Sequence, residues 1–351
     1  MNITYVLGAG ASANALPVVR DMNRRISVFI EHLKKECPLN TEQENQLSNI
    51  FEQIKKHYTI DTYAKKLFLK KRHGESDLFK LYNFMGAYFI YEQLGKKAEY
   101  DVCKYLFDNS SIPARNSSFE IYNGIIESVD YRYDSFYAAI LVNDKDGDVS
   151  LPSNINIVSW NYDFQLEISF MNFMVGAGLD QVQRKLRIYP SPSNEQTDRN
   201  YSIVKINGTA GLFAEGNTYG KLFDFRSHVL DRDAMKILKD IIFQSRSAYK
   251  NSIYFAWDDN DVTRNARNYA RNIVSDADIL VVIGYSFPYF NRDIDRVIFS
   301  ALEGRGRTIY IQTPEDSFVS TKHRAMGANH LFEEARQFSE LDQFLIPNEF
   351  K

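Results

Sequence analysis

Hydrophobic residues follow two different spacings along the chain, and the change between them predicts its organisation. Residues 3–7 (Ile-Thr-Tyr-Val-Leu) form a short apolar run bounded by glycine, which predicts a buried strand. Apolar residues then recur at i, i+3, i+4 and i+7, as they do within residues 26–33, and this is the spacing of one helix face. The spacing continues to about residue 145 and predicts a helical bundle inserted after the first strand.

From about residue 155, short apolar strands alternate with amphipathic helices. The run 279–283 is continuously apolar, as expected for a strand covered on both faces. The other expected strands are 155–158, 202–206, 253–256 and 308–311. This alternation predicts an α/β fold, with a Rossmann-like, mostly parallel sheet that carries helices on both faces. We therefore expect a Rossmann-like domain built from residues 1–20 and 150–351, and a large all-helical insertion over residues 21–149.

Composition and charge exclude several classes of protein. The formal net charge of −3 gives no reason to expect direct nucleic-acid binding. No apolar run approaches the length of a membrane span, and the N-terminus carries no basic leader followed by a long apolar stretch. The two cysteines, Cys37 and Cys103, form no C-x-x-C pair and cannot build a structural zinc site by themselves. We expect a cytoplasmic protein that makes no contact with a membrane.

One segment has the beginning of a calcium-binding loop. Residues 144–148 (Asp-Lys-Asp-Gly-Asp) match its first positions, but Ile155 stands where the loop needs a bidentate glutamate. The histidines of the chain also lack metal-ligand spacing. We therefore expect a polar loop here and no metal in the protein.

Three short segments carry the candidate chemistry. They are 8–12 (Gly-Ala-Gly-Ala-Ser), 159–163 (Ser-Trp-Asn-Tyr-Asp) and 283–286 (Ile-Gly-Tyr-Ser), and each follows or ends an apolar run. The carboxyl ends of parallel strands open into a ligand crevice, so the three segments predict one nucleotide pocket. The first segment has the glycine spacing that lets a backbone approach a pyrophosphate. No second strand with a ribose-binding acid follows, which argues against a hydride-transfer enzyme.

Each of these features also has a simpler interpretation. Glycines occur in any tight turn from a strand to a helix. Asp163 can cap the helix expected from Phe164, and the pair Asn207 and Gly208 can form only a turn. The basic segment 55–74 is most simply a solvated helix face, with a docking surface for an acidic partner or nucleic acid as the alternative.

Together the segments resemble the sirtuin family, and are most similar to bacterial sirtuin-like NAD hydrolases of antiphage defence. The likeness extends to residues 17–20 (Pro-Val-Val-Arg) and to the late strand and turn 277–286. It implies that the chain cleaves NAD, as substrate, to nicotinamide and ADP-ribose. It also implies a homo-oligomer, a sensing or activating partner protein, or both.

The resemblance assigns roles to particular residues. It implies that Asn161 positions the ribose and a water, that Asp163 binds the carboxamide or faces the developing positive charge, and that Asn207 holds a ribose hydroxyl. The NAD-binding positions that it implies are Gly8, Ala9, Gly10, Ala11, Ser12, Pro17, Arg20, Asn161, Asp163, Gly208, Gly284, Tyr285, Ser286 and Thr313.

The sequence departs from the family at two places. Peptide-deacylating sirtuins carry a four-cysteine zinc ribbon, which two cysteines cannot build, so deacylation is the weakest option. The usual catalytic histidine is replaced by Asn207, whose amide takes up no proton near neutral pH. His228 is the alternative source of a base. The second hypothesis is therefore a catalytically silent module that binds NAD or ADP-ribose and regulates a defence complex.

Overall fold

The computed structural model describes most of the chain. The described residues are 1–57, 59–70, 73–94, 96–97, 121–122, 125–126, 129–143, 147–174, 176–190, 200–215, 218–221, 223, 225, 230–243, 250–303 and 306–350. The side chains of Val19 and Arg20, residues 144–146 of the polar loop, Cys103 and His228 lie outside this description.

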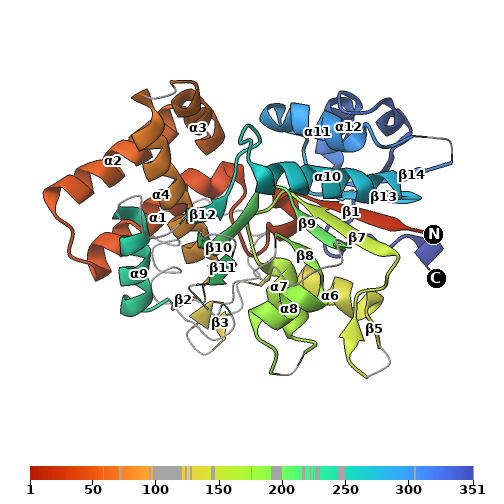
Figure 1. The fold of residues 1–351 in the computed structure, drawn as a ribbon, viewed down its shortest axis with the longest axis horizontal. Coiled ribbons are helices and arrows are strands. Elements are labelled where there is room, and N and C mark those ends of the chain that lie inside the picture. The colour runs from red at the N-terminus through yellow and green to blue at the C-terminus, as the bar shows by residue number, and fades with distance from the viewer. Residues whose placement is uncertain are drawn as a thin grey trace.

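A seven-stranded parallel sheet forms the centre of the fold and confirms the predicted α/β class (Figure 1). Its strands, in spatial order, are β15 (Arg336–Phe338), β14 (Thr308–Gln312), β13 (Ile279–Ile283), β1 (Ile3–Leu7), β7 (Ile155–Ser159), β9 (Ile203–Lys205) and β8 (Ile188–Tyr189). The chain builds β7 and β9 on one side of β1 and then crosses to β13 on the other side. The strand order therefore reverses beside β1, which is where open α/β sheets bind their ligands.

Helices cover both faces of this sheet, as predicted. One face carries α6 (Tyr131–Ile140), α7 (Gln165–Met171) and α8 (Leu179–Lys185), and the other carries α10 (Asp261–Ser275), α11 (Arg292–Phe299) and α12 (Phe318–Met326). Figure 1 shows the two sets on opposite sides of the strands. Along β1, Tyr5 packs towards α6 and Val6 towards α10 and α11, because successive side chains of a strand point to opposite faces. The sheet is thus buried on both sides.

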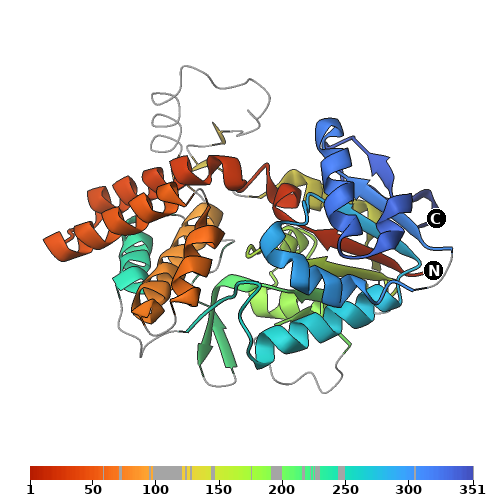
Figure 2. The ribbon, with the colours of Figure 1, turned by 90° about the horizontal axis from the view of Figure 1, so that it is seen from above.

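A second core lies beside the sheet domain, in the helical unit on the left of Figure 1. It contains α1 (Val19–Glu36), α2 (Thr41–Lys56), α3 (Ile60–Leu69), α4 (Glu75–Gln93) and α9 (Arg232–Phe243). Figure 2 shows the same grouping from above. The helix α9 joins this unit although it is far along the chain, because its apolar face, including Met235 and Leu238, packs in the same core. The unit therefore draws on both halves of the sequence.

The boundary of the insertion differs from the predicted one at residue 149. The helix α6 lies within residues 21–149, but Tyr133, Phe136 and Tyr137 pack on the parallel sheet. The predicted insertion also contains the short strands β2 (Lys96–Lys97), β3 (Ile121–Tyr122), β4 (Ile125–Ile126) and β5 (Val142–Asn143), of which β5 pairs with β6 (Val149–Ser150). Helical spacing identifies an apolar face but does not say which core that face joins.

The prediction that residues 253–256 form a strand of the parallel sheet is wrong. Ile253 ends β12 (Lys250–Ile253), which pairs antiparallel with β10 (Gly208–Glu215) in a separate small sheet completed by β11 (Thr218–Lys221). The Tyr254 N–H donates to the Asn207 oxygen at 2.8 Å, so the segment is held by the turn after β9. Apolar, aromatic runs of this length suit either kind of strand.

Five 3₁₀ helices complete the described secondary structure. They are η1 (Ala9–Ser12), η3 (Tyr289–Asn291), η4 (Glu315–Ser317), η5 (His330–Glu334) and η6 (Asn348–Phe350). Of these, η1 follows β1 directly and so stands at the carboxyl end of the central strand.

Candidate functional site

Glycines bring the turns after β1 and β13 into direct contact. A Cβ atom on Gly10 would lie 2.7 Å from the Gly284 Cα, and one on Gly8 would lie 2.5 Å from the Tyr285 Cα. Gly284 itself has a φ of +60°, and a Cβ there would lie 2.4 Å from the Ala11 nitrogen. The glycines therefore allow two backbone turns to pack closely together. The sequence analysis had explained the same glycine spacing by the close approach of a pyrophosphate.

Some backbone donors in these turns remain available. The Gly8 and Gly10 N–H groups donate to the Ile283 and Gly284 carbonyl oxygens, both at 3.0 Å. The N–H groups of Ala9, Tyr285 and Ser286 have no hydrogen-bond partner among the residues that the structure describes. All three residues line the cavity described next. Grouped N–H donors of this kind suit an anion such as phosphate.

A cavity of about 230 Å³ lies at the carboxyl ends of β1, β7, β9 and β13, and residues of the helical unit form its opposite wall. Nine of the predicted site residues line it, namely Ala9, Ser12, Pro17, Asn161, Asp163, Asn207, Gly284, Tyr285 and Ser286. Segments more than a hundred residues apart in the sequence therefore meet at one place, beside the point where the strand order reverses.

Other predicted positions do not line this cavity. Gly8, Gly10 and Ala11 lie behind the lining residues of their turn, and Gly208 opens β10 with a φ of +73°. Thr313 donates its N–H to the Phe338 oxygen at 3.2 Å, at the far side of β14. The Arg20 side chain and His228 fall outside the described part of the chain.

Ser12 is the centre of a buried hydrogen-bond network. Its hydroxyl donates to Asp163 Oδ2 at 2.8 Å and accepts from Asn161 Nδ2 at 3.2 Å. Because that hydroxyl proton points to Asp163, the Tyr133 hydroxyl, 3.0 Å away, donates to Ser12 Oγ. Asn161 Nδ2 also donates to the Gly8 oxygen at 3.0 Å. The first two predicted motifs are thus locked together.

Asp163 lines the cavity and also contacts the start of α7. Its Oδ1 accepts from the N–H of Gln165, the first residue of α7, at 3.1 Å, but the N-cap position of this helix is Phe164, so Asp163 binds the helix end from one residue before the predicted cap position. Lys205, fully buried, donates to the Asp163 backbone oxygen at 2.7 Å and pairs with Glu167 at 2.6 Å. Burial raises the pKa of the Asp163 carboxyl, and the charge of Lys205 opposes that rise. A raised pKa brings a carboxylate nearer to the range useful for proton transfer.

The two asparagines keep one acceptor atom each for a ligand. Both are 8% exposed. Asn207 Nδ2 donates to the Trp160 oxygen at 3.1 Å, while Asn161 Nδ2 makes the contacts with Ser12 and Gly8. Neither Oδ1 atom has a hydrogen-bond partner within the described ranges. Both Oδ1 atoms are reached by solvent, so each can accept a hydrogen bond from water or from a polar ligand in the cavity.

The cavity walls are aromatic and acidic. Trp160 stacks on Tyr285 at a centroid distance of 4.5 Å, and Phe89 packs on Tyr162 at 5.1 Å. Within the described lining the charged side chains are those of Asp61 and Asp163, with no Lys or Arg. Sequence analysis did not find Asp61, Phe89 or Trp257, which come from the helical unit and from the loop after β12. No motif surrounds these residues, so no local signal marked them.

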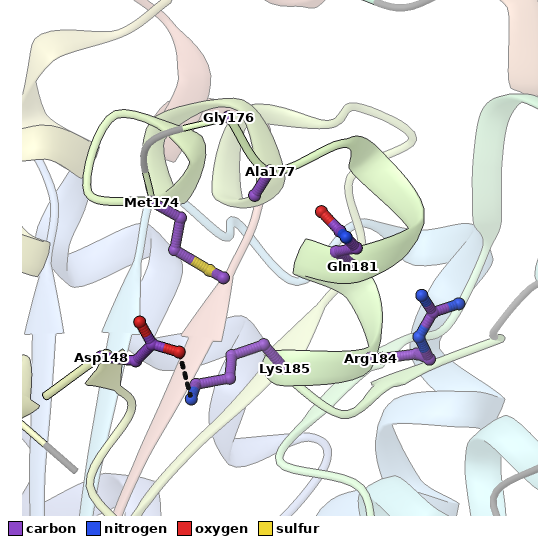
Figure 3. A pocket seen from close by; sticks show the side chains of 7 residues that line it. All are labelled: Asp148, Met174, Gly176, Ala177, Gln181, Arg184 and Lys185. Carbon is purple, nitrogen blue, oxygen red and sulfur yellow. Dashed lines mark ion pairs between the residues drawn. The ribbon is translucent and has the colours of Figure 1, made fainter. Parts of the chain in front are cut away.

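A larger hollow, of about 640 Å³, lies elsewhere (Figure 3). It is an open depression beside α8, and its lining residues are Asp148, Met174, Gly176, Ala177, Gln181, Arg184 and Lys185. Lys185 lies 3.9 Å from Asp148, an ion-pair distance, and the dashed line in Figure 3 marks this pair. Because none of the predicted site residues lines this depression, we assign the candidate site to the smaller cavity.

The basic segment 55–74 has ordinary surface contacts. Lys55 pairs with Glu52 at 3.3 Å, and Lys66 contacts the His57 ring nitrogen at 2.9 Å. The Lys65 ammonium lies 4.7 Å from the centre of the Trp257 ring. Residues 71–72 lie outside the description. These contacts are those of a solvated helix face with one lysine anchored beside the cavity.

The described residues include neither a metal-binding cluster nor a membrane-spanning helix. No three His, Cys, Asp or Glu side chains among them gather in a way that would hold a metal ion. None of their helices combines the length and the apolar character needed to cross a bilayer.

Comparison with known proteins adds no assignment: no protein-family model matches the chain, and no curated protein sequence does. The functional argument therefore depends on the geometry of the cavity.

Proposed function

We propose that this chain binds NAD and hydrolyses the bond between nicotinamide and its ribose. The observation that carries the proposal is the convergence of Ser12, Asn161, Asp163 and Asn207, from three turns at strand ends, on one cavity beside the strand-order reversal. The unpartnered acceptors of the asparagines support a ligand rich in hydroxyl groups. The free N–H groups of the glycine turns support a ligand that also carries phosphate.

The reaction makes modest demands on the protein. Water adds to C1′ of the ribose, the C–N bond breaks, and its electron pair leaves with nicotinamide, which becomes neutral. The products are nicotinamide, ADP-ribose and one proton. Catalysis consists of holding the ribose, stabilising the positive charge at C1′ and placing one water. These are tasks for polar atoms in fixed positions.

The cavity residues divide these tasks in the proposed mechanism. Asn161 Oδ1 accepts a hydrogen bond from the attacking water, and Asn207 Oδ1 accepts one from a ribose hydroxyl. The Asp163 carboxylate faces the charge that develops at C1′ and receives the proton that the water loses, which its raised pKa supports. Ser12 holds the side chains of Asn161 and Asp163 in position through its hydrogen bonds to both. In this scheme no histidine is required.

The size of the cavity supports the placement of one end of the dinucleotide. Ligand pockets usually enclose about 300–1,000 Å³, and this one has about 230 Å³. We place the nicotinamide riboside inside and the pyrophosphate at the N–H groups of Ala9, Tyr285 and Ser286. The adenosine then lies outside. Oligomerisation or a sensing partner, and a role in depleting NAD during phage infection, follow from the sequence resemblance alone.

Product analysis tests the proposal. Purified protein, alone and with the products of neighbouring genes, is incubated with NAD while nicotinamide and ADP-ribose are measured. We expect both products in equal amounts, and a loss of about a hundredfold or more in rate for Asn161→Ala. The folded state and ADP-ribose binding of that variant are the controls. Unchanged turnover by a folded Asn161→Ala protein would remove Asn161 from catalysis.

A specific observation favours a second candidate, the silent binding module. Both Asp163 oxygens already accept hydrogen bonds, from Gln165 and Ser12, and Asn207 supplies no base. A module of this kind would bind NAD and ADP-ribose with similar strength and release no nicotinamide under any condition, including with partners present. The same product analysis separates it from the enzyme.

A further inference from the structure

The cavity contains one carboxylate that the proposed reaction does not use. Asp61 belongs to the first turn of α3, whose N-terminus is capped by Thr59 through the Thr62 N–H at 3.2 Å. Asp61 lines the cavity, is only partly exposed, and has no hydrogen-bond or ion-pair partner in the described part of the chain. An unpaired, poorly solvated charge is costly, so its retention needs a reason.

Two neighbouring residues describe the electrostatic surroundings of Asp61. Lys65 lies one helical turn further along α3, and its ammonium sits 4.7 Å from the ring centre of Trp257, another cavity residue. The Lys65 ammonium therefore contacts an aromatic ring, and it forms no ion pair with Asp61. The charge of Asp61 also reaches Tyr162, since it adds to the rise that burial produces in the pKa of the Tyr162 hydroxyl.

Aromatic rings line the cavity together with this carboxylate. Tyr162 packs on Phe89 at 5.1 Å, and Phe255 stacks on Trp257 at 4.7 Å with an interplanar angle of 10°. All four residues line the cavity with Asp61. Aromatic faces and an unpaired carboxylate together attract a flat cation, whereas they repel phosphate and gain little from a neutral ring.

We propose that Asp61 and these aromatic residues recognise the pyridinium ring of NAD by its positive charge, so that Asp61 makes the site specific for the oxidised dinucleotide. The inference rests on the proposed function and deepens it by assigning one end of the cavity. Oxidised nicotinamide carries a full positive charge, and the reduced ring is neutral. The helical unit thus supplies specificity, while the turns of the sheet hold the ribose and the water.

Binding measurements with three ligands test this assignment. The ligands are carba-NAD, which keeps the pyridinium charge but resists hydrolysis, NADH, which lacks the charge, and ADP-ribose, which lacks the ring. Calorimetry is performed on the full chain as wild type, Asp61→Asn, Asp61→Glu and Asp77→Asn. Asp77 is the matched control, because it is exposed in the first turn of α4 and does not line the cavity.

The expected pattern is selective. Asp61→Asn weakens carba-NAD binding about tenfold, the loss of one favourable charge contact, and changes NADH and ADP-ribose binding less than about twofold. Asp61→Glu retains most of the preference for the cationic ligand, and Asp77→Asn behaves as the wild type does. Since Asp61 makes no hydrogen bond in the described structure, neither exchange at this position removes a folding contact.

Other outcomes would overturn the assignment in distinguishable ways. If Asp61→Asn leaves carba-NAD binding unchanged while ADP-ribose still binds, the charge-recognition role is wrong and the proposed function stands. An equal loss for all three ligands would make Asp61 a structural residue. If the wild-type protein binds none of them, the proposed function fails and this inference fails with it.

Discussion

The two walls of the cavity are built in different ways. On the sheet side, Ser12, Asn161 and Asp163 bind one another and the backbone through hydrogen bonds of 2.8–3.2 Å. On the helical side, Asp61 has no partner in the described structure and stands among aromatic rings. The side chains of the first wall are held in place by hydrogen bonds, and we call it the rigid wall, whereas the carboxylate of the second wall lacks a counter-charge in the described structure. This difference indicates that one wall positions a ligand and the other selects it by charge.

The largest expected effect comes from breaking the rigid wall. In Gly10→Val the new side chain must occupy space only 2.7 Å from the Gly284 Cα, which is backbone and cannot move aside. We expect a loss of about 3 kcal/mol in the free energy of unfolding, measured by denaturant titration, and loss of ADP-ribose binding. Ala13→Val, an exposed position in the same turn, is the control. A Gly10→Val protein of normal stability would show that the two turns are not tightly packed.

A smaller effect is expected at the edge of the rigid wall. Asn207→Ala removes an acceptor from the cavity and should lower turnover about tenfold, with little change in stability, because its side chain makes a single hydrogen bond to Trp160. Asn207→His offers a base and should preserve or raise the rate. Initial rates of nicotinamide release measure both. Turnover unaffected by Asn207→Ala would leave Asn207 as a turn residue only.

The helical wall should give the site its response to acid. Burial raises the pKa of Asp61 to about 6. The titratable side chains that line the cavity with it include Asp163 and Tyr162, whose hydroxyl is neutral because burial raises its pKa, and Lys65 of the same helix lies beside the Trp257 ring. Below that pH Asp61 becomes neutral, so the KM for NAD should rise severalfold as the pH falls through about 6.

The Asp61→Asn variant isolates this response. Its KM should be high and nearly independent of pH in the same range, whereas Asp77→Asn should keep the wild-type profile. A histidine titrates in this region as well, and His228 is the candidate. A pH response that survives Asp61→Asn and disappears in His228→Ala would assign it to His228.

The smallest expected effect is on the pH dependence of protein stability, through Asp295, whose carboxyl group contacts Tyr285 of the rigid wall. Burial raises the pKa of Asp295 to about 8, although the hydrogen bond from the Tyr285 hydroxyl, at 2.7 Å, opposes the rise. The folded protein therefore holds this proton more tightly than the unfolded chain, whose aspartates titrate near pH 4. The stability that Asp295 contributes is complete below about pH 4 and is lost as the pH rises towards about 8.

Asp295→Asn should remove this loss. The melting temperature of the wild type should fall more between pH 5 and pH 8 than that of the variant, by roughly a few degrees for a chain of this size. Equal falls for the two proteins would mean that Asp295 is ionised in the folded state throughout this range.

The sequence by itself determined the local elements and the positions of three turns. Runs such as 3–7 and 279–283 indicated buried strands, because they are short, mostly apolar on both faces and bounded by glycine at their ends. Helical spacing identified the helices in the same way. The three motifs stood at strand ends, and parallel strands bring such ends to one edge. The convergence of Ser12, Asn161 and Asp163 was therefore predictable.

Only the tertiary structure decided which apolar faces share a core and what faces the cavity from the other side. The helix α6 joined the sheet, α9 joined the helical unit, and residues 250–253 paired with β10, since burial rewards contact area and not sequence distance. Asp61 shows the same limit. A single acidic residue in the first turn of a helix is common in protein sequences. Asp61 becomes a candidate binding residue only because folding places it in the cavity together with aromatic rings.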